Sequence, residues 1–170
     1  RVAYDVVYSS RTVVKNKYYN EKVRPGYYET DVWGEYYALI AKYIPQGYTI
    51  YGEIVGYVGG LSQMIQKGYD YGCQPGENRL MIYRVSTDEN GRKRELNISE
   101  VQDFSTNLVK RMQADDNEGA TRIIPLPILY HGTLSELYPS LDTTNHWHEN
   151  LLEQMKHDSE HFGMEQDEPL

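Results

Sequence analysis

The chain is poor in cysteine, in phenylalanine and in long apolar runs. Its 170 residues include a single cysteine, Cys73, which excludes a framework of intrachain disulfides. No apolar run approaches the roughly 20 residues that a helix needs to cross a bilayer. No basic stretch followed by an apolar one suggests a signal peptide. We therefore expect a globular, cytoplasmic chain, and this length favours a single domain.

The aromatic residues are almost all tyrosine, with 17 Tyr against two Phe and two Trp. A tyrosine ring can pack against a core while its hydroxyl group reaches water. This composition is typical of a half-exposed sheet, and we interpret most of the tyrosines in that way.

Basic residues are scarce only in the last third of the chain. Residues 1–60 and 61–112 each carry a net charge of +1, whereas residues 113–170 hold two basic and twelve acidic side chains. The formal net charge of −8 therefore arises entirely in that last third. The first two thirds remain free to present a local basic surface to a nucleotide or polynucleotide.

Hydrophobic spacing predicts two core helices. Apolar and aromatic residues recur every three or four positions over 33–43, and Asp31 can cap the N-terminus of that helix. Ser99 and Gln102 have the spacing of a capping box before an apolar face that ends at Met112. A third helix is predicted over 145–156, with these side chains facing inward: Trp147, Leu151, Leu152 and Met155.

Four stretches are rich in the β-branched and aromatic residues typical of strands: Val2–Val14, Tyr48–Val58, Arg79–Ser86 and Ile123–His131. A turn and a polar return to Leu96 follow the third stretch, which predicts a hairpin. Pro125 and Pro127 confine the fourth to an edge or an irregular segment. Because the helices and strands do not alternate regularly, we expect an α+β fold with antiparallel sheets and flanking helices.

A carboxylate, Glu53, occupies the middle of the predicted strand 48–58. Apolar residues alternate with it, so one face of the strand is apolar and Glu53 lies on the other. Gly52 and Gly56 have no side chains and allow a ligand or another backbone to approach closely. Glu53 is either a ligand-binding group or a charge on a solvated strand face, and spacing alone favours the second interpretation.

Two further residues have the chemistry of nucleotide binding. Arg11 ends the first predicted strand beside small hydroxyl residues, and a guanidinium offers a fixed fork of donors to phosphate and ribose oxygens. Tyr83 lies in the centre of an aliphatic strand, where its ring could stack on a base or belong to the core. Between the strands, the loop Ile65–Gly76 is dense in Gly and Tyr, as binding loops often are.

Together, the order and spacing of these segments resemble the ATP-dependent RNA ligases of the phage type, within the covalent nucleotidyltransferase superfamily. Ser10-Arg11-Thr12 is similar to the arginine motif that follows the nucleotidyl lysine. Tyr51-Gly-Glu-Ile-Val-Gly56 is similar to the Gly-Glu motif III, and Met81-Ile-Tyr-Arg-Val85 to the aromatic motif IIIa. The segments 66–73 and 128–132 also resemble stretches seen in such ligases.

This resemblance implies a nucleotidyltransferase fold of the ATP-grasp-like ligase kind. Residues 1–170 would be the central part of that domain, with an acidic helical segment and tail at about 134–170. The resemblance also implies roles for three residues: Arg11 would contact the ribose and phosphates of ATP, Glu53 the ribose hydroxyls, and Tyr83 would stack on adenine. Magnesium is expected with ATP, and the partners would be 5′-phosphate and 3′-hydroxyl ends of RNA.

The nucleophilic lysine of the family is absent from the chain. Its motif, Lys-x-x-Gly or Lys-x-Asp-Gly, lies upstream of the arginine motif, and residues 1–10 contain no lysine. Lys15, Lys17 and Lys22 follow Arg11 and lack the glycine pattern, and the later motifs, Glu-Gly followed by apolar residues and then Lys-x-Lys, do not occur before Leu170. We therefore expect an internal fragment of a ligase domain that does not form lysyl-AMP by itself.

Other interpretations remain open at this stage. A DNA ligase or a capping enzyme would share the same motifs. A non-catalytic, Tyr-rich domain that binds protein or single-stranded nucleic acid would also suit the composition. The pairs His146/His148 and His157/His161 could supply metal ligands, but their acidic surroundings favour a solvated helix face, and we predict no metal site there.

Overall fold

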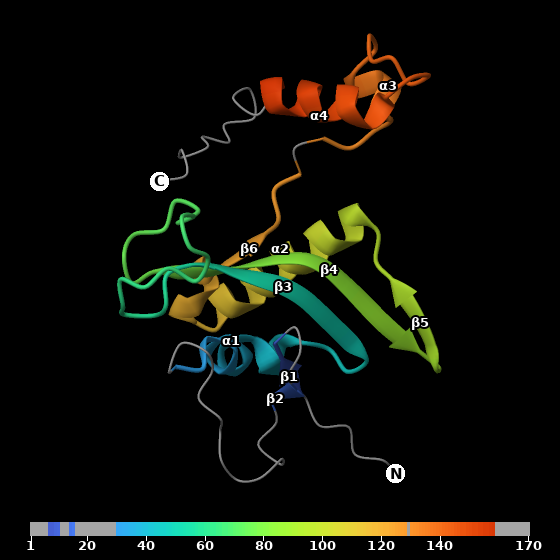
Figure 1. The fold of residues 1–170 in the computed structure, drawn as a ribbon. Coiled ribbons are helices and arrows are strands. Elements are labelled where there is room, and N and C mark those ends of the chain that lie inside the picture. The colour runs from blue at the N-terminus through green and yellow to red at the C-terminus, as the bar shows by residue number, and fades with distance from the viewer. Residues whose placement is uncertain (1–6, 11–13, 16–29, 129, 159–170) are drawn as a thin grey trace. The chain divides into compact units, whose positions relative to one another are not determined.

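The computed structural model describes residues 7–10, 14–15, 30–128 and 130–158 (Figure 1). The chain divides into two compact units, Arg1–Leu126 and Pro127–Leu170. Helices and strands are both present, and the larger sheet contains strands of both directions. The fold is therefore α+β.

A four-stranded sheet forms the centre of the first unit, built from β3 (Tyr48–Gly56), β4 (Asn78–Glu89), β5 (Arg92–Glu95) and β6 (Ile123–Pro125). β3 pairs along one edge of the long strand β4, and β5 and β6 pair with different parts of its other edge. The predicted hairpin is confirmed as β4 and β5. Asn90 and Gly91, with φ of 57° and 78°, form its two-residue turn.

One strand contradicts the expectation of purely antiparallel sheets. β6 runs parallel to β4, with Leu80 opposite Ile123, so the sheet is mixed. The chain reaches β6 through α2 (Ile98–Ala114) and η2 (Glu118–Arg122), a helical crossover of the kind that parallel pairing requires. A strand of three residues has too little pattern to indicate its direction, although its edge position was predicted.

The N-terminal strand prediction is also wrong in the part that the structure describes. β1 (Tyr8–Ser9) and β2 (Val14–Lys15) pair with each other in antiparallel fashion. Because β1 and β2 are separate, antiparallel strands, Val2–Val14 is not one strand.

The segment β1 is attached to α1 (Val32–Ile40) through a tyrosine. The Tyr8 hydroxyl donates a hydrogen bond to Asp31 Oδ2 at 2.8 Å, and the Tyr8 ring stacks on Tyr37 with centroids 4.7 Å apart. Asp31 is the N-cap residue of α1, as predicted, but its side chain makes no capping hydrogen bond there. Its carboxylate instead accepts the hydrogen bond from Tyr8.

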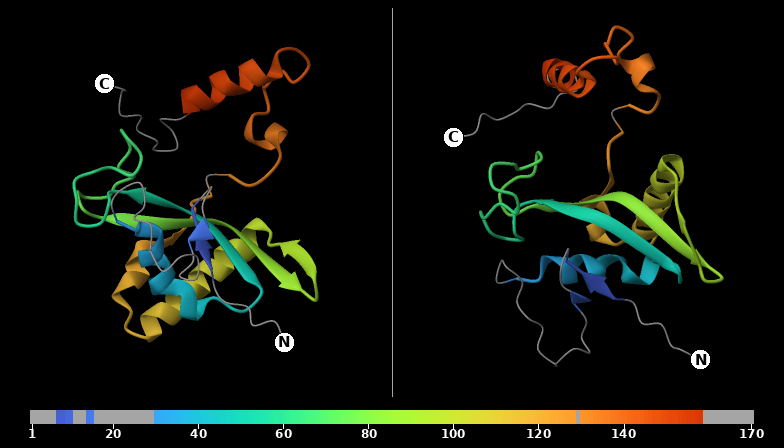
Figure 2. Two further views of the ribbon diagram at one scale, coloured as in Figure 1. Left: turned by 60° about the horizontal axis from the view of Figure 1, so that its bottom comes forward. Right: turned by 45° about the vertical axis from the view of Figure 1, so that its right-hand side comes forward.

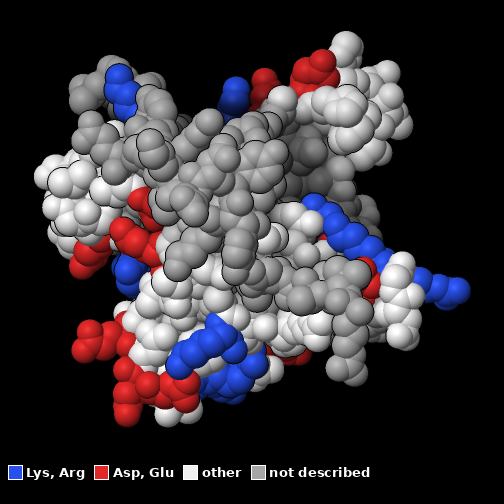
Figure 3. Space-filling model, turned by 90° about the horizontal axis from the view of Figure 1, so that it is seen from below, with Lys and Arg blue, Asp and Glu red and all other residues white. Residues whose placement is uncertain are grey.

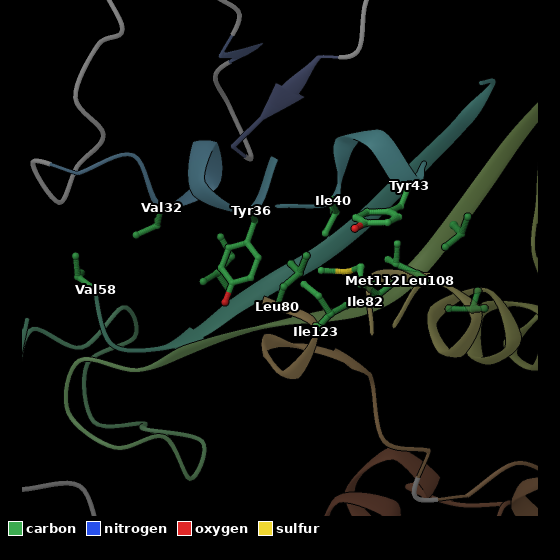
Figure 4. Close-up of a cluster of buried hydrophobic side chains, with 14 residues drawn as sticks. Val32, Tyr36, Ile40, Tyr43, Val58, Leu80, Ile82, Leu108, Met112 and Ile123 are labelled. Atoms are coloured by element: carbon green, nitrogen blue, oxygen red, sulfur yellow. The ribbon is translucent and has the colours of Figure 1, made fainter. Parts of the chain in front are cut away.

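The hydrophobic core lies between one face of the sheet and the helices α1 and α2 (Figure 4). α1 continues into the short helix η1 (Ala41–Tyr43), which confirms the predicted helix up to Tyr43. Several of the core side chains are labelled in Figure 4: Val32, Tyr36, Ile40 and Tyr43 from α1 and η1, Leu80 and Ile82 from β4, Leu108 and Met112 from α2, and Ile123 from β6.

The cap of the helix α2 lies two residues earlier than predicted. Asn97 Oδ1 accepts a hydrogen bond from the Glu100 amide at 3.0 Å, and Glu100 Oε2 accepts one from the Asn97 amide at 2.8 Å. The capping box is thus Asn97/Glu100 and not Ser99/Gln102. The predicted apolar face is otherwise confirmed, since Val101, Leu108 and Met112 are buried.

A buried polar network joins α1 to β4 and η2. The Tyr36 hydroxyl donates to Asn78 Oδ1 at 2.7 Å, and Asn78 Nδ2 donates to the Tyr57 carbonyl at 2.8 Å. The Arg122 guanidinium also donates to Asn78 Oδ1 and lies over the Tyr36 ring. Because Tyr36 and Asn78 are each only 3% exposed, these hydrogen bonds satisfy groups that have no access to bulk water.

The ribbon of β3 and β4 has a loop at one end and the β4–β5 turn at the other (Figure 1 and Figure 2). The loop covers residues 57–77 and is closed by a hydrogen bond from the Tyr57 amide to the Glu77 carbonyl at 2.7 Å. The loop and the β4–β5 turn therefore lie at opposite ends of this ribbon, and the candidate site lies on the sheet between them.

The second unit contains two helices, α3 (Leu134–Leu137) and α4 (Trp147–Asp158). The third predicted helix is confirmed as α4, but its predicted inward face is wrong in part. Trp147, Leu152 and Met155 are 39%, 58% and 54% exposed. In the described part of the chain, no helix has the length and apolar character required to span a membrane.

Candidate functional site

Glu53 and Tyr83 lie on the same face of the sheet. Leu80 and Ile82 point into the core, so the residues that alternate with them on β4 point the other way. Glu53 is paired with Met81, and Tyr83 follows two residues later on β4. We call this side, opposite to the face packed against α1 and α2, the outer face. Glu53 is exposed there, and Tyr83 is 50% exposed.

A β-bulge adds a second exposed residue beside Tyr83. Tyr51 is paired with Arg84 and Gly52 with Ile82, so Tyr83 has no partner of its own on β3. Ile82 and Val85 are both fully buried, and the two residues between them therefore point outward together. Bulges re-aim side chains in this way and are frequent next to functional sites. The sequence alone gave no indication of the bulge.

The loop brings a tyrosine to Glu53. Burial, and then the nearby Glu53 carboxylate, raise the pKa of Tyr71. The Tyr71 hydroxyl donates a hydrogen bond to Gln66 Oε1 at 2.6 Å, and its ring lies 6.1 Å from that of Tyr69. Tyr71 has φ of 54°, a conformation uncommon for a bulky residue, and such strain is often found at functional positions. The loop was predicted to carry binding groups, but its approach to Glu53 was not.

The two glycines of β3 allow close approach by the protein's own atoms. A Cβ on Gly52 would lie 2.7 Å from Leu80 Cδ1 and 2.9 Å from the Met81 carbonyl oxygen. Gly56 has φ of +94°, and its Cβ would lie 2.7 Å from Cys73 Sγ. The sequence predicted that either a ligand or another part of the chain approaches these glycines. In the described residues it is other parts of the chain that do so: Leu80 and Met81 at Gly52, and Cys73 at Gly56.

Further along the outer face lies a cluster of four charged or aromatic side chains, Tyr51, Arg84, Lys93 and Glu95. Arg84 donates from Nε and Nη2 to the two carboxylate oxygens of Glu95, at 2.9 and 2.6 Å. Its Cζ lies 4.4 Å from the centroid of the Tyr51 ring. Lys93 Nζ donates to the Tyr51 hydroxyl at 3.2 Å. This hydrogen bond is the largest cause of a lowered pKa of Tyr51.

Arg11 lies outside the described residues, so the structure does not place it with Glu53 and Tyr83. The nearest described strand, β1, is attached to α1, which packs on the opposite face of the sheet. The structure thus brings together two of the three predicted residues and adds Tyr71, Arg84 and their contacts.

Some of the charges of the first unit form ion pairs. Lys42 lies 2.8 Å from Asp115 and Arg94 lies 2.9 Å from Glu100, both on the surface. On the face seen in Figure 3, basic side chains lie next to acidic ones at the lower left. The balanced composition of this region therefore corresponds to neighbouring charges of opposite sign.

Two of the described histidines make other contacts. His146 Nδ1 lies 4.0 Å from Glu149 Oε1, and His148 stacks on Trp147 with centroids 3.6 Å apart. His161 lies outside the described residues. Within the described ranges, no group of three or more His, Cys, Asp or Glu side chains is arranged to hold a metal ion.

No protein-family model, curated protein or solved structure matches this chain. The function of the outer face is therefore inferred from its own residues, above all from the shared exposure of Glu53 and Tyr83.

Proposed function

We propose that this chain is the adenylate-binding portion of the nucleotidyltransferase domain of an ATP-dependent polynucleotide ligase, acting on RNA ends. The observation that carries the proposal is that Glu53 and Tyr83 lie exposed on one sheet face, with Tyr83 two residues beyond the pairing partner of Glu53 on the neighbouring strand. Two residues along a strand span about 7 Å. That spacing suits one nucleoside, with its base at one group and its ribose at the other.

Each group has a defined task in this proposal. The Tyr83 ring stacks on adenine, since an aromatic side chain offers a face to any base. The Glu53 carboxylate accepts hydrogen bonds from the ribose hydroxyls, and charged acceptors make the stronger hydrogen bonds. Tyr71 on the loop, whose pKa the Glu53 carboxylate helps to raise, would lie towards the ribose. Arg11 remains a proposed contact of the phosphates.

The reaction proposed for the whole ligase domain has three steps. A lysine attacks the α-phosphorus of ATP and releases pyrophosphate, and the resulting lysyl-AMP passes its AMP to a 5′-phosphate end. The 3′-hydroxyl of a second end then attacks the activated phosphate, which forms the phosphodiester bond and releases AMP. In this proposal, the residues described here bind and orient the adenosine.

Magnesium would reach this site on the phosphates of ATP. The cation usually binds through one or two carboxylates together with substrate phosphates and keeps several waters. On the outer face, Glu53 is an exposed carboxylate, whereas Glu95 is engaged by Arg84. The ion would neutralise the charge of the phosphates while this chain's residues hold the nucleoside.

The proposal predicts that AMP and ATP bind the chain and that changes on the outer face weaken binding. Tyr83→Ala removes the stacking ring, and Glu53→Gln removes the charged acceptor, so each should raise the Kd for AMP about tenfold. Isothermal titration calorimetry with AMP, ATP and GTP measures the effect.

Matched controls come from the second unit. Trp147 is 39% exposed, and Glu153 is exposed on α4. Trp147→Ala and Glu153→Gln should bind AMP as the wild type does. If Tyr83→Ala and Glu53→Gln also left binding unchanged, or if the wild type bound no adenine nucleotide, the proposal would be rejected. Binding of oligonucleotides without AMP would then favour a non-catalytic domain that binds single-stranded nucleic acid.

A further inference from the structure

The bulge leaves one exposed group of the outer face without a role in adenylate binding. Arg84 follows Tyr83 directly, and both side chains point outward because Ile82 and Val85 are buried on either side of them. A regular strand would have directed one of the two into the core. The bulge therefore places a planar cation immediately beside the proposed adenine site.

The guanidinium of Arg84 is held in a fixed orientation. Glu95 binds it through two hydrogen bonds, at 2.9 and 2.6 Å, and the ring of Tyr51 lies behind it at 4.4 Å. Lys93 in turn holds the Tyr51 hydroxyl at 3.2 Å. These contacts raise the pKa of Arg84 and lower that of Glu95, as expected of a tight ion pair. An arginine in this setting loses little further side-chain entropy when a ligand binds.

The same side chain keeps access to solvent. Its exposed fraction is 47%, and that of Lys93 is 56%. Arginine planes serve, like aromatic rings, as surfaces on which unpaired bases stack in complexes with single-stranded nucleic acid. Two cations share one carboxylate here, so the cluster has an excess positive charge that suits a phosphate.

We propose that Arg84, supported by Tyr51 and Glu95, is a second stacking plane that binds the terminal base of a 5′-phosphorylated, single-stranded polynucleotide. Lys93 lies where it attracts the phosphate backbone. The inference rests on the proposed function in one respect only, namely that the adenylate stacks on the neighbouring ring of Tyr83. The two neighbouring planes would hold AMP and the terminal nucleotide of the 5′-phosphate end. The second step of the proposed reaction links these two through their phosphates.

The test uses the complete chain and a fluorescent, single-stranded oligonucleotide with a 5′-phosphate, whose terminal nucleotide is either intact or abasic. Fluorescence anisotropy gives the Kd of each. The wild type should bind the intact end about tenfold more tightly than the abasic end, the effect of one stacked base. Arg84→Lys keeps the charge but loses the plane, so it should bind both ends with the weaker affinity.

A control and a second variant sharpen this test. Arg92→Lys changes an exposed arginine of the same hairpin whose register places it on the opposite face of the sheet, and it should behave as the wild type. Glu95→Gln increases the positive charge but frees the guanidinium. If Arg84 acted only as a point charge, Glu95→Gln would bind both ends more tightly than the wild type does. If Arg84 is a stacking plane, the difference in Kd between intact and abasic ends should be smaller in Glu95→Gln than in the wild type.

Three results would overturn the inference: equal binding of intact and abasic ends by the wild type, unchanged discrimination in Arg84→Lys, or no oligonucleotide binding at all. AMP titrated into the same samples separates the two proposals. Failure to bind AMP contradicts the proposed function, while the comparison of intact and abasic ends still decides whether Arg84 stacks on a base.

Discussion

The hydroxyl of Tyr36 is a buried titratable group whose proton takes part in the polar network around Asn78. Burial raises the pKa of Tyr36 to about 12, although the neighbouring Arg122 acts in the opposite direction. The folded protein therefore keeps a proton that the unfolded chain loses near pH 10. The polar network around Asn78 depends on that proton, since the hydroxyl must donate to Oδ1.

Stability should consequently fall in alkaline solution. Because the folded pKa lies above the unfolded one, the contribution of Tyr36 is complete below about pH 10 and is lost as the pH rises towards about 12, by ~1–3 kcal/mol. Tyr36→Phe should unfold more easily at neutral pH by about 1 kcal/mol, the cost of one hydrogen bond, but show a smaller decline in base. Urea unfolding at about pH 8 and about pH 11 measures both effects.

Tyr8 is a second case of the same titration. Burial and a hydrogen bond to Asp31 raise its pKa to about 12 as well. Tyr8→Phe should therefore also reduce the alkaline decline in stability. Equal slopes for the wild type and Tyr36→Phe would contradict the assignment.

At the scale of elements, local signals in the sequence predicted the helices and the hairpin, but not how the strands pair. Apolar periodicity located α1, η1 and α2, and the turn at Asn90 and Gly91 located the β4–β5 hairpin. The bulge and the parallel direction of β6 depend on contacts between distant residues. No local pattern encodes such contacts, because the same strand residues can pair in more than one register.

The same distinction applies to the candidate site. Alternation along β3 was enough to predict that Glu53 faces away from the core. Whether Tyr83 stacks or packs could not be decided, since an aliphatic strand with one ring suits both. Its exposure follows from its alternation with the buried Leu80 and Ile82, whereas the bulge creates the neighbouring outward position of Arg84.

The N-terminus of α2 offers a quantitative test at this scale. Two residues with capping potential, Asn97 and Ser99, compete for the role, and the structure assigns it to Asn97. Asn97→Ala should lower the free energy of unfolding by about 1 kcal/mol, because the Glu100 amide loses its acceptor. Ser99→Ala should change it by no more than a few tenths of that value. Urea unfolding of both variants measures the difference. A larger loss of stability in Ser99→Ala than in Asn97→Ala would mean that Ser99 is the cap, as the sequence predicted.

At the scale of the molecule, charge and core are distributed unequally between the two units. Residues 1–126 hold 16 of the 17 basic and 16 of the 25 acidic side chains, a net charge of zero, so residues 127–170 carry the whole −8. The buried cluster shows the same division, since its members lie between Val32 and Ile123. The first unit thus has its own core and no net charge to repel a polynucleotide.

A chain that ends at Leu126 should therefore fold and keep the outer face. Its core residues are all retained, as is the hydrogen bond from Gln102 Nε2 to the Leu126 carbonyl at 2.9 Å. Domains with a core of their own fold independently, so we expect a cooperative thermal transition within a few degrees of that of the full chain. AMP affinity should be unchanged, since Glu53, Tyr83 and Tyr71 all precede the cut. Circular dichroism melting and AMP titration of both chains test this, and a truncated chain without a cooperative transition would mean that the first unit depends on residues 127–170 for its stability.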